Sequence, residues 1–158
     1  MPKEGAGILL YRQRGGRQRG GTIEVFLVHP GGPFWKNKDE GAWTIPKGEP
    51  NTGEDKLAAA IREFAEETGT VLAGDFRALP PIKQAGGKWV HAWAIAGDLD
   101  PATLVSNEFE MEWPPRSGKR ARFPEVDRGA WFALEAARDK INKGQTALLD
   151  ALSPLLAG

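Results

Sequence analysis

The chain has 158 residues, of which 41% are hydrophobic, and this suits one domain with a single core. It contains no cysteine, which excludes a disulfide scaffold, a thiolate zinc site and a cysteine nucleophile. Lys and Arg together number 21, as do Asp and Glu, and this balance argues against a general nucleic-acid or membrane-surface binder. Because no apolar run is long enough to span a bilayer and the start does not resemble a signal peptide, we expect one cytoplasmic domain over residues 1–158.

Short segments rich in apolar and β-branched residues predict strands in the first half of the chain. They cover residues 7–11, 23–29 and 43–45. Between the first two strands the unit RQRGG occurs twice, over residues 12–16 and 17–21. We interpret this repeat as a solvated hairpin loop, with a small arginine–glycine patch for RNA or phosphate as the alternative. The Gly, Pro and charged residues of segment 30–41 predict a loop.

A helix is predicted next, over residues 53–68. Asn51 or Thr52 can cap its first turn, and Gly69 stands where a left-handed C-terminal residue is favoured.

The second half contains predicted strands over residues 88–96, 109–113 and 130–132, and predicted helices over residues 134–143 and 145–156. Apart from the strand near residue 110, segment 98–128 is expected to be mostly irregular. Strands before, between and after helices indicate an α/β domain, with a mixed sheet and helices packed against it.

Three glutamates of the predicted helix, Glu63, Glu66 and Glu67, have the i, i+3 and i+4 spacing of neighbours on a helix surface. They lie on the side opposite a core-facing stripe that contains Ile61 and Phe64. Carboxylates this close repel one another unless a cation lies between them or water screens them. A set of oxygen ligands without histidine or cysteine favours Mg²⁺ or Mn²⁺ over Zn²⁺. Alone, the three glutamates fit a metal site and a solvated acidic face equally well.

The flanking residues complete a longer pattern, whose fixed positions are Gly48, Glu54, Arg62, Glu63, Glu66, Glu67 and Gly69. Residues 48–69 therefore resemble the Nudix box, the signature of the Nudix (MutT-like) hydrolases. The Trp-x-x-Pro-Lys-Gly segment at residues 43–48 and the order of the predicted elements are also similar to that family. Thr70 departs from the aliphatic residue usual after the box, although Val71 follows it. The resemblance implies a Nudix α/β/α sandwich, with a mixed β-sheet flanked by the box helix and the C-terminal helices.

The resemblance also implies roles for single residues. The catalytic metal ligands would be Glu63, Glu66 and Glu67, with the carbonyl of Gly48 as a further ligand. Glu54 and Arg62 would form an ion pair that orients the helix, direct metal contact by Glu54 being the alternative. Gly48 and Gly69 are interpreted as turn positions that a Cβ would disfavour. The general base of the family is often a glutamate before the last strand, and Glu125 resembles it. The alternatives for the base are Glu108, Glu110 and Glu112.

Other residues are candidates for substrate contact. Lys47 precedes the box glycine and is a candidate for binding a substrate phosphate. Trp43 is a candidate for stacking on a nucleobase, with core packing as the alternative. His91 lies in a predicted strand, where a structural hydrogen-bonded role is the alternative to a catalytic one. A basic segment contains Arg116, Lys119, Arg120 and Arg122. One or two of these side chains are candidates for binding a substrate phosphate, and the others are expected to lie in a solvated loop.

The reaction implied by the resemblance is Mg²⁺-dependent hydrolysis of a diphosphate linkage in a small nucleotide-type substrate. Lysine before the box glycine is similar to the form in dinucleoside-polyphosphate and diphosphoinositol-polyphosphate hydrolases, so a dinucleoside polyphosphate is the favoured substrate. A (d)NTP and an ADP-ribose or nucleotide-sugar substrate are the alternatives. A non-catalytic module that binds a nucleotide or RNA is the alternative of another class, and the complete box argues against it. Many members of the family form homodimers, but the sequence leaves the oligomeric state open.

Overall fold

The computed structural model describes residues 4–14, 22–84 and 86–157, so most of the repeated RQRGG segment lies outside the described residues. The strands are β1 (Glu4–Arg14), β2 (Thr22–Pro30), β3 (Lys47–Gly48), β4 (Arg77–Ala78), β5 (Ile82–Lys83), β6 (Trp89–Ala96), β7 (Glu108–Glu112), β8 (Arg120–Pro124) and β9 (Val126–Ala133). The helices are α1 (Lys56–Thr68), α2 (Leu134–Lys140) and α3 (Thr146–Ala157), with 3₁₀ turns at Pro101–Thr103 and Lys143–Gln145.

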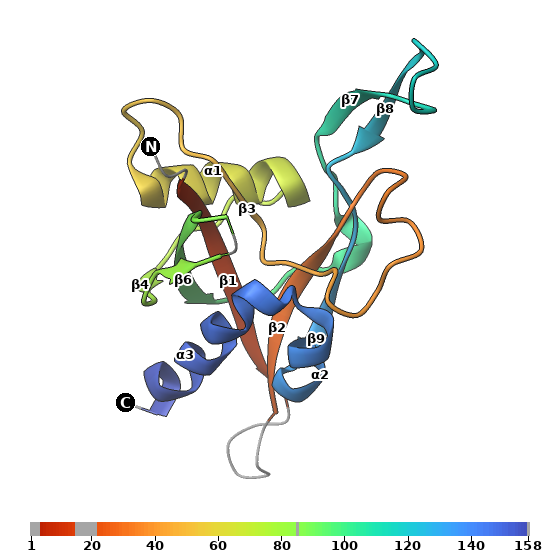
Figure 1. Ribbon diagram of the computed structural model, residues 1–158. Helices are drawn as coiled ribbons and strands as arrows, with labels where there is room; N and C mark the ends of the chain where they lie inside the picture. Colours follow the sequence, from red (N-terminus) through yellow and green to blue (C-terminus); the bar gives the residue numbers. More distant parts are fainter. Residues whose placement is uncertain (1–3, 15–21, 85, 158) are drawn as a thin grey trace.

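A mixed sheet forms the centre of the domain, as predicted, with the order β4-β6-β1-β2-β9. The long strand β1 runs parallel to β6 and antiparallel to β2 (Figure 1). The short strand β3 also pairs with β1, and its register places Lys47 opposite Gly7 and Gly48 opposite Ala6. The segment that leads into helix α1 is therefore attached to the central strand.

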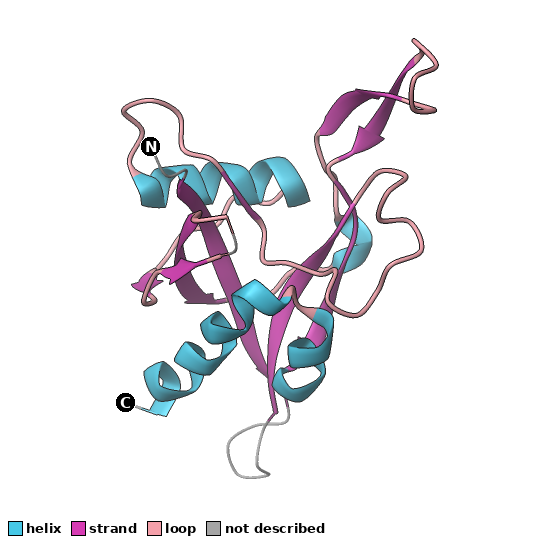
Figure 2. Ribbon diagram, in the orientation of Figure 1, coloured by secondary structure: helices cyan, strands magenta, loops and turns pink. Residues whose placement is uncertain are grey.

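Helices cover both faces of this sheet, which confirms the predicted α/β/α sandwich (Figure 2). Successive side chains of a strand point to opposite faces. Ile8 and Leu10 thus pack with Phe64 of α1, while Leu9 packs on the other face with Ala137 of α2 and residues of α3. Residues 5–10 of β1 are buried on both faces, so their nearly continuous apolar sequence reflects two covered faces.

Helix α1 begins later than predicted and ends where predicted. Its N-cap is Asp55, whose carboxylate accepts a hydrogen bond from the backbone N–H of Ala58, so neither Asn51 nor Thr52 is the cap. The preceding residues form a turn at Gly53, which has a φ of 77° and so interrupts the helical conformation. At the C-terminal end Gly69 adopts a φ of 83° and donates to the carbonyl of Ala65, as expected for a left-handed cap.

The two C-terminal helices were also predicted, and the 3₁₀ turn that contains Gly144 separates them. Helix α2 ends at Lys140, three residues earlier than expected, because Ile141 adopts an extended conformation and bridges to Trp43. In the described ranges, none of the helices combines the length and apolar character needed to cross a membrane.

The strand predicted near residue 110 is confirmed as β7, whereas a second strand of segment 98–128, β8, was not predicted. Strands β7 and β8 pair antiparallel and form a hairpin that projects from the body of the domain (Figure 1). Diagonal ion pairs join its strands, since Arg120 donates to Glu110 and Arg122 donates to Glu108. These charge pairs lie on one face of the hairpin, and on the other face Phe109 pairs with Phe123, with 6.0 Å between their ring centroids. The hairpin leads directly into β9, which begins at Val126 rather than at residue 130.

Candidate active site

Three carboxylates converge beside strand β3. Glu63 and Glu67 lie on successive turns of α1, and Glu125 is the single residue between β8 and β9. Each side chain offers one oxygen, and these oxygens lie within 4.8 Å of one another. Glu125 is held in place by its own backbone, which donates to the carbonyl of Asn107 and accepts from the N–H of Gly31. The fold therefore joins the two helix glutamates to a residue about 60 positions later in the sequence.

The other glutamates considered from the sequence lie outside this trio. Glu66 lies beside it, and both of its carboxylate oxygens are 3.2 Å from Nη1 of Arg62. Glu108 and Glu110 pair with arginines of β8, and Glu112 accepts a hydrogen bond from the backbone of Arg116. Glu125 is thus the candidate base that the structure places next to Glu63 and Glu67.

Gly48 provides the space that the Glu63 carboxylate occupies. A Cβ on Gly48 would lie 2.1 Å from Cδ of Glu63 and 2.2 Å from its Oε2. Gly48 is not among the residues with positive φ, so the interpretation as a turn position is corrected. Its requirement for glycine is steric, because any side chain here would displace a carboxylate of the trio.

Arg62 links α1 to the segment that precedes it. Its Nε and Nη2 each donate to one oxygen of Glu54 at 3.0 Å, which is the bidentate geometry of a strong ion pair. Nη2 also donates to the carbonyl of Glu49, and Nη1 donates to Glu63 at 2.9 Å. Hydrogen bonds from Arg62 and from the backbone of Asn51 lower the pKa of Glu54. Both oxygens of Glu54 are therefore engaged, which favours its orienting role over direct metal contact.

The carboxylate trio is electrostatically costly to ionise. Burial, together with the nearby Glu125 and Glu63, raises the pKa of Glu67 to about 8. Burial is also the main cause that raises the pKa of Glu63, although Arg62 opposes this shift. The pKa of Glu125 is raised by burial and by Glu66. Like charges held this close in a partly buried position favour binding of a cation.

Two lysines lie on the β3 side of the trio. The backbone N–H and the ammonium of Lys47 oppose the rise in the pKa of Glu67. Burial and the neighbouring Lys88 lower the pKa of the Lys47 ammonium, while Glu67, Glu49 and Glu63 act in the opposite direction. The Nζ of Lys88 lies 4.0 Å from Oε1 of Glu49. Sequence reasoning did not identify Lys88, because only the pairing of β6 with β1 brings it near Lys47.

Trp43 lies in the core and not at this surface. Its side chain is 4% exposed, its Nε1 donates to Asp39, and its ring packs edge-to-face against Phe132 and His29. It therefore lacks the free aromatic face that stacking on a base requires. His91 lies 3.4 Å from the Glu4 carboxylate at the start of β1.

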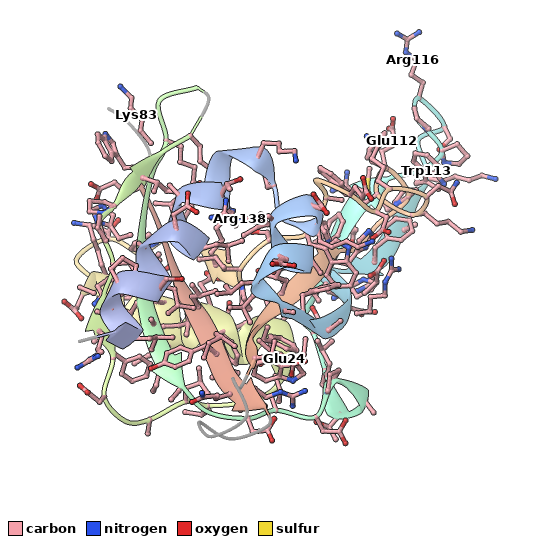
Figure 3. The ribbon with its side chains drawn as sticks, turned by 90° about the horizontal axis from the view of Figure 1, so that it is seen from below. Glu24, Lys83, Glu112, Trp113, Arg116 and Arg138 are labelled. Carbon is pink, nitrogen blue, oxygen red and sulfur yellow. The ribbon has the colours of Figure 1, made fainter. Side chains whose placement is uncertain are left out.

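The basic segment lies on the projecting hairpin. Arg120 and Arg122 take part in its ion pairs, and Arg116 extends from the tip away from the domain (Figure 3). None of these arginines reaches the trio.

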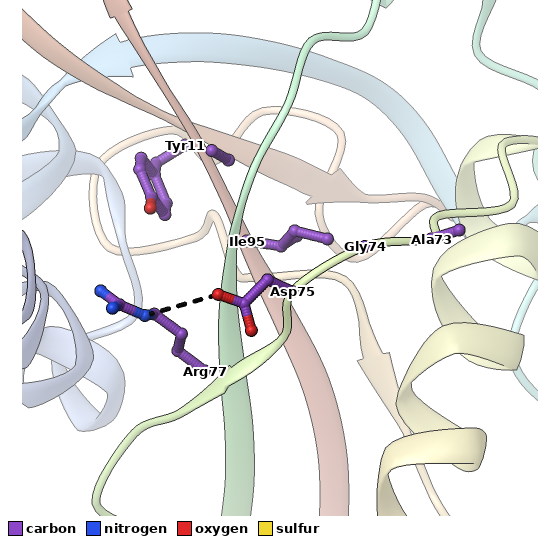
Figure 4. Close-up of a pocket in the computed structure, with 7 residues that line it drawn as sticks. Tyr11, Ala73, Gly74, Asp75, Arg77 and Ile95 are labelled. Carbon is purple, nitrogen blue, oxygen red and sulfur yellow. Dashed lines mark ion pairs between the residues drawn. The ribbon is translucent and has the colours of Figure 1, made fainter.

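A small pocket of about 180 Å³ lies at another part of the sheet and is lined by Tyr11, Ala73, Gly74, Asp75, Arg77, Ile95 and Ala96 (Figure 4). Asp75 and Arg77 form an ion pair at its edge. Tyr11 is five residues along β1 from Ala6, which pairs with Gly48, and so lies roughly 17 Å from the β3 end. This pocket is therefore separate from the carboxylate trio.

The arrangement matches a known family. The model of the NUDIX domain matches residues 1–152. The chain belongs to the Nudix family. Residues 48–69 are thus its Nudix box, and the trio consists of two box glutamates and Glu125.

Curated proteins with different activities in their names are similar to this chain. An mRNA-decapping protein of African swine fever virus, g5R, is 32% identical over 110 residues, which are 70% of this chain and 44% of that protein. An 8-oxo-(d)GTP phosphatase of Mycolicibacterium smegmatis is 32% identical over 148 residues, which are 86% of this chain and 36% of that protein. The chain spans less than half the length of these curated relatives.

Solved structures share the fold along the whole chain. An Ap4A hydrolase of C. elegans in a binary complex has a TM-score of 0.65 at 25% identity, with 98% of each chain covered. The Nudix domain of Shewanella oneidensis NrtR with ADP ribose has a TM-score of 0.64 at 14% identity and covers 99% of this chain. The second likeness shows the Nudix fold alone.

Proposed function

We propose that this Nudix protein hydrolyses a diphosphate linkage in a nucleotide-type substrate, with a dinucleoside polyphosphate as the favoured substrate. The observation that carries the proposal is the convergence of Glu63, Glu67 and Glu125 beside Lys47. This arrangement combines a set of carboxylates suited to a cation with an ammonium suited to a phosphate.

The donor set fits a divalent cation with a preference for oxygen ligands, and we propose Mg²⁺, with Mn²⁺ as the alternative. Glu63, Glu67 and the adjacent Glu66 would hold it, together with the carbonyl of Gly48. The raised pKa of Glu67 supports this assignment, because a bound cation would relieve the repulsion that causes the shift. When bound, such a cation neutralises charge on the diphosphate oxygens and makes water more acidic.

The remaining roles follow from position and charge. We assign Glu125 as the base that accepts a proton from the attacking water, since a carboxylate with a raised pKa is a better base near neutral pH. Lys47 would bind a phosphate oxygen of the substrate from the β3 side. Arg62 would act indirectly, by fixing Glu63 and Glu66 relative to the loop before the helix.

The choice of substrate rests on two independent features. Lys47 stands before Gly48, as in Nudix hydrolases of long polyphosphates, and its ammonium lies at the charged side of the trio. The Ap4A hydrolase of C. elegans is similar over 98% of both chains. The resemblance to an 8-oxo-(d)GTP phosphatase makes a (d)NTP substrate the second candidate.

A substrate panel tests the proposal. The protein is incubated with Mg²⁺ and, separately, with diadenosine tetraphosphate, 8-oxo-dGTP, ADP-ribose and a capped oligoribonucleotide, and the products are separated by ion-exchange chromatography. We expect the highest kcat/KM for diadenosine tetraphosphate and no turnover after chelation of the metal. A higher kcat/KM for 8-oxo-dGTP would favour the second candidate, and no turnover of any compound would contradict the enzymatic assignment. Hydrolysis in ¹⁸O-labelled water identifies the phosphorus that is attacked.

A further inference from the structure

The β2–β3 loop is packed against the β7–β8 hairpin at two levels. Near the body of the domain, the N–H of Gly31 donates to the carbonyl of Glu125. A Cβ on Gly31 would lie 1.9 Å from the carbonyl oxygen of Pro124, so this contact requires glycine. Farther out, the ring of Phe34 meets the ring of Trp113 edge-to-face, with 5.5 Å between their centroids. Loop and hairpin thus form one continuous surface that starts at Glu125.

This surface exposes aromatic residues that the core does not use. Phe34 is 58% exposed, and the adjacent Trp35 is 37% exposed. An exposed aromatic pair held in a fixed geometry offers a face on which any nucleobase can stack. The Nζ of Lys38 lies over the ring of Trp35, the residue after Phe34, and adds a positive charge near the pair. Positive charge beside an aromatic face suits a ligand that combines a base with phosphates.

The distance from the trio to this pair fits a long ligand. Trp113 lies opposite Lys119, to whose carbonyl its N–H donates, and the segment from Lys119 to Glu125 consists of β8 and one residue on each side of it. At about 3.3 Å per residue this extended segment spans about 20 Å, so Trp113 lies roughly 20 Å from Glu125. A dinucleoside polyphosphate whose phosphate chain lies at the trio has a nucleoside at each end, and one of them can extend toward the aromatic pair. A nucleoside triphosphate has a single nucleoside, so it cannot occupy the aromatic pair and another base site at the same time.

We propose that Phe34 and Trp113 bind the nucleobase at the far end of a 5′,5′-linked dinucleoside polyphosphate while its phosphate chain lies at the carboxylate trio. This inference rests on the proposed function and gives it a physical basis for selecting the longer substrate. Phe34 and Trp113 determine specificity and take no part in the bond cleavage.

Two substrates that differ only in the second nucleoside test this inference. The KM and kcat are measured for diadenosine tetraphosphate and for adenosine 5′-tetraphosphate, with the unaltered protein and with Phe34→Leu, which keeps an apolar side chain but removes the aromatic face. We expect Phe34→Leu to raise the KM for diadenosine tetraphosphate about tenfold, which corresponds to about 1.4 kcal/mol of stacking. The KM for adenosine 5′-tetraphosphate and both kcat values should change less than twofold. Phe34→Trp should retain the KM of the unaltered protein.

Controls separate this result from other causes. Trp113→Ala should reproduce the selective effect, and Trp89→Ala, which removes a 37% exposed tryptophan of β6, should not. Equal effects of Phe34→Leu on both substrates, no effect on either, or a change in oligomeric state on size-exclusion chromatography would overturn the inference. If the unaltered protein hydrolyses neither tetraphosphate, the proposed function fails together with the inference. If it hydrolyses diadenosine tetraphosphate and Phe34→Leu leaves the selectivity unchanged, only the inference fails.

Discussion

Replacing Glu67 by Gln is expected to stabilise the metal-free protein, although it removes an assigned ligand. The folded protein raises the pKa of this carboxyl from its ordinary value of 4.5 to about 8. Below pH 4.5 the side chain is protonated in both the folded and the unfolded chain, so it does not affect the free energy of unfolding. Above pH 4.5 the unfolded chain ionises first, and the folded state loses about 1.4 kcal/mol of stability per pH unit until the pKa near 8 is reached.

The size of the effect follows from these two pKa values. At pH 7.5 the ionisation of Glu67 costs the folded state up to about 4 kcal/mol, and at pH 5.5 it costs about 1.4 kcal/mol. Gln has nearly the same shape and does not ionise, so the variant avoids this cost. For a chain of this length 1 kcal/mol shifts the Tm by roughly 2–4 °C. We therefore expect Glu67→Gln to raise the Tm by roughly 8–16 °C at pH 7.5 and by roughly 3–6 °C at pH 5.5.

Thermal unfolding in the presence of a chelator, at both pH values, measures this difference. Glu40→Gln is the matched control, since Glu40 is an exposed carboxylate of the β2–β3 loop, and its Tm should follow that of the unaltered protein. Saturating Mg²⁺ should remove the advantage of Glu67→Gln, because the unaltered protein gains more binding energy. A metal-free variant that is less stable than the unaltered protein at pH 7.5, or equally stabilised at both pH values, would refute the electrostatic reasoning.

Three further results are expected. In calorimetry, Mg²⁺ should raise the Tm of the unaltered protein more at pH 7.5 than at pH 5.5, because protons compete with the metal for the same carboxylates. An equal rise in Tm at both pH values would argue against ligation by Glu67. Gly48→Ala should lower kcat about 100-fold, since its Cβ would displace the Glu63 carboxylate by more than ~1 Å; steady-state kinetics that matched the unaltered protein would contradict this steric role. Arg62→Lys should lower kcat at least ~10-fold and the Tm by a few degrees, because lysine keeps the charge but not the bidentate contact with Glu54. Steady-state kinetics and thermal unfolding measure the two effects, and an unchanged kcat or an unchanged Tm would contradict this role.

The sequence predicted the parts of the site that depend on local geometry. The helical period placed Glu63 and Glu67 one turn apart, and the left-handed Gly69 marked the end of their helix. The same reasoning missed β8, because only Ala121 and Phe123 alternate with its arginines and so short a segment gives a weak period-two signal. It also misread Gly48, since a steric requirement for glycine and a conformational one look identical in a sequence.

The sequence by itself determined the family pattern and the grouping of three glutamates on one helix, because both follow from spacing along the chain. Only the tertiary structure decided which carboxylates converge. Arg62 engages Glu66, whereas the packing of the β8–β9 junction against Gly31 and Asn107 brings Glu125 to the helix. These contacts depend on backbone hydrogen bonds between segments far apart in the chain, which no local periodicity encodes. The surface formed by the β2–β3 loop and the β7–β8 hairpin likewise depends on contacts between distant segments of the chain.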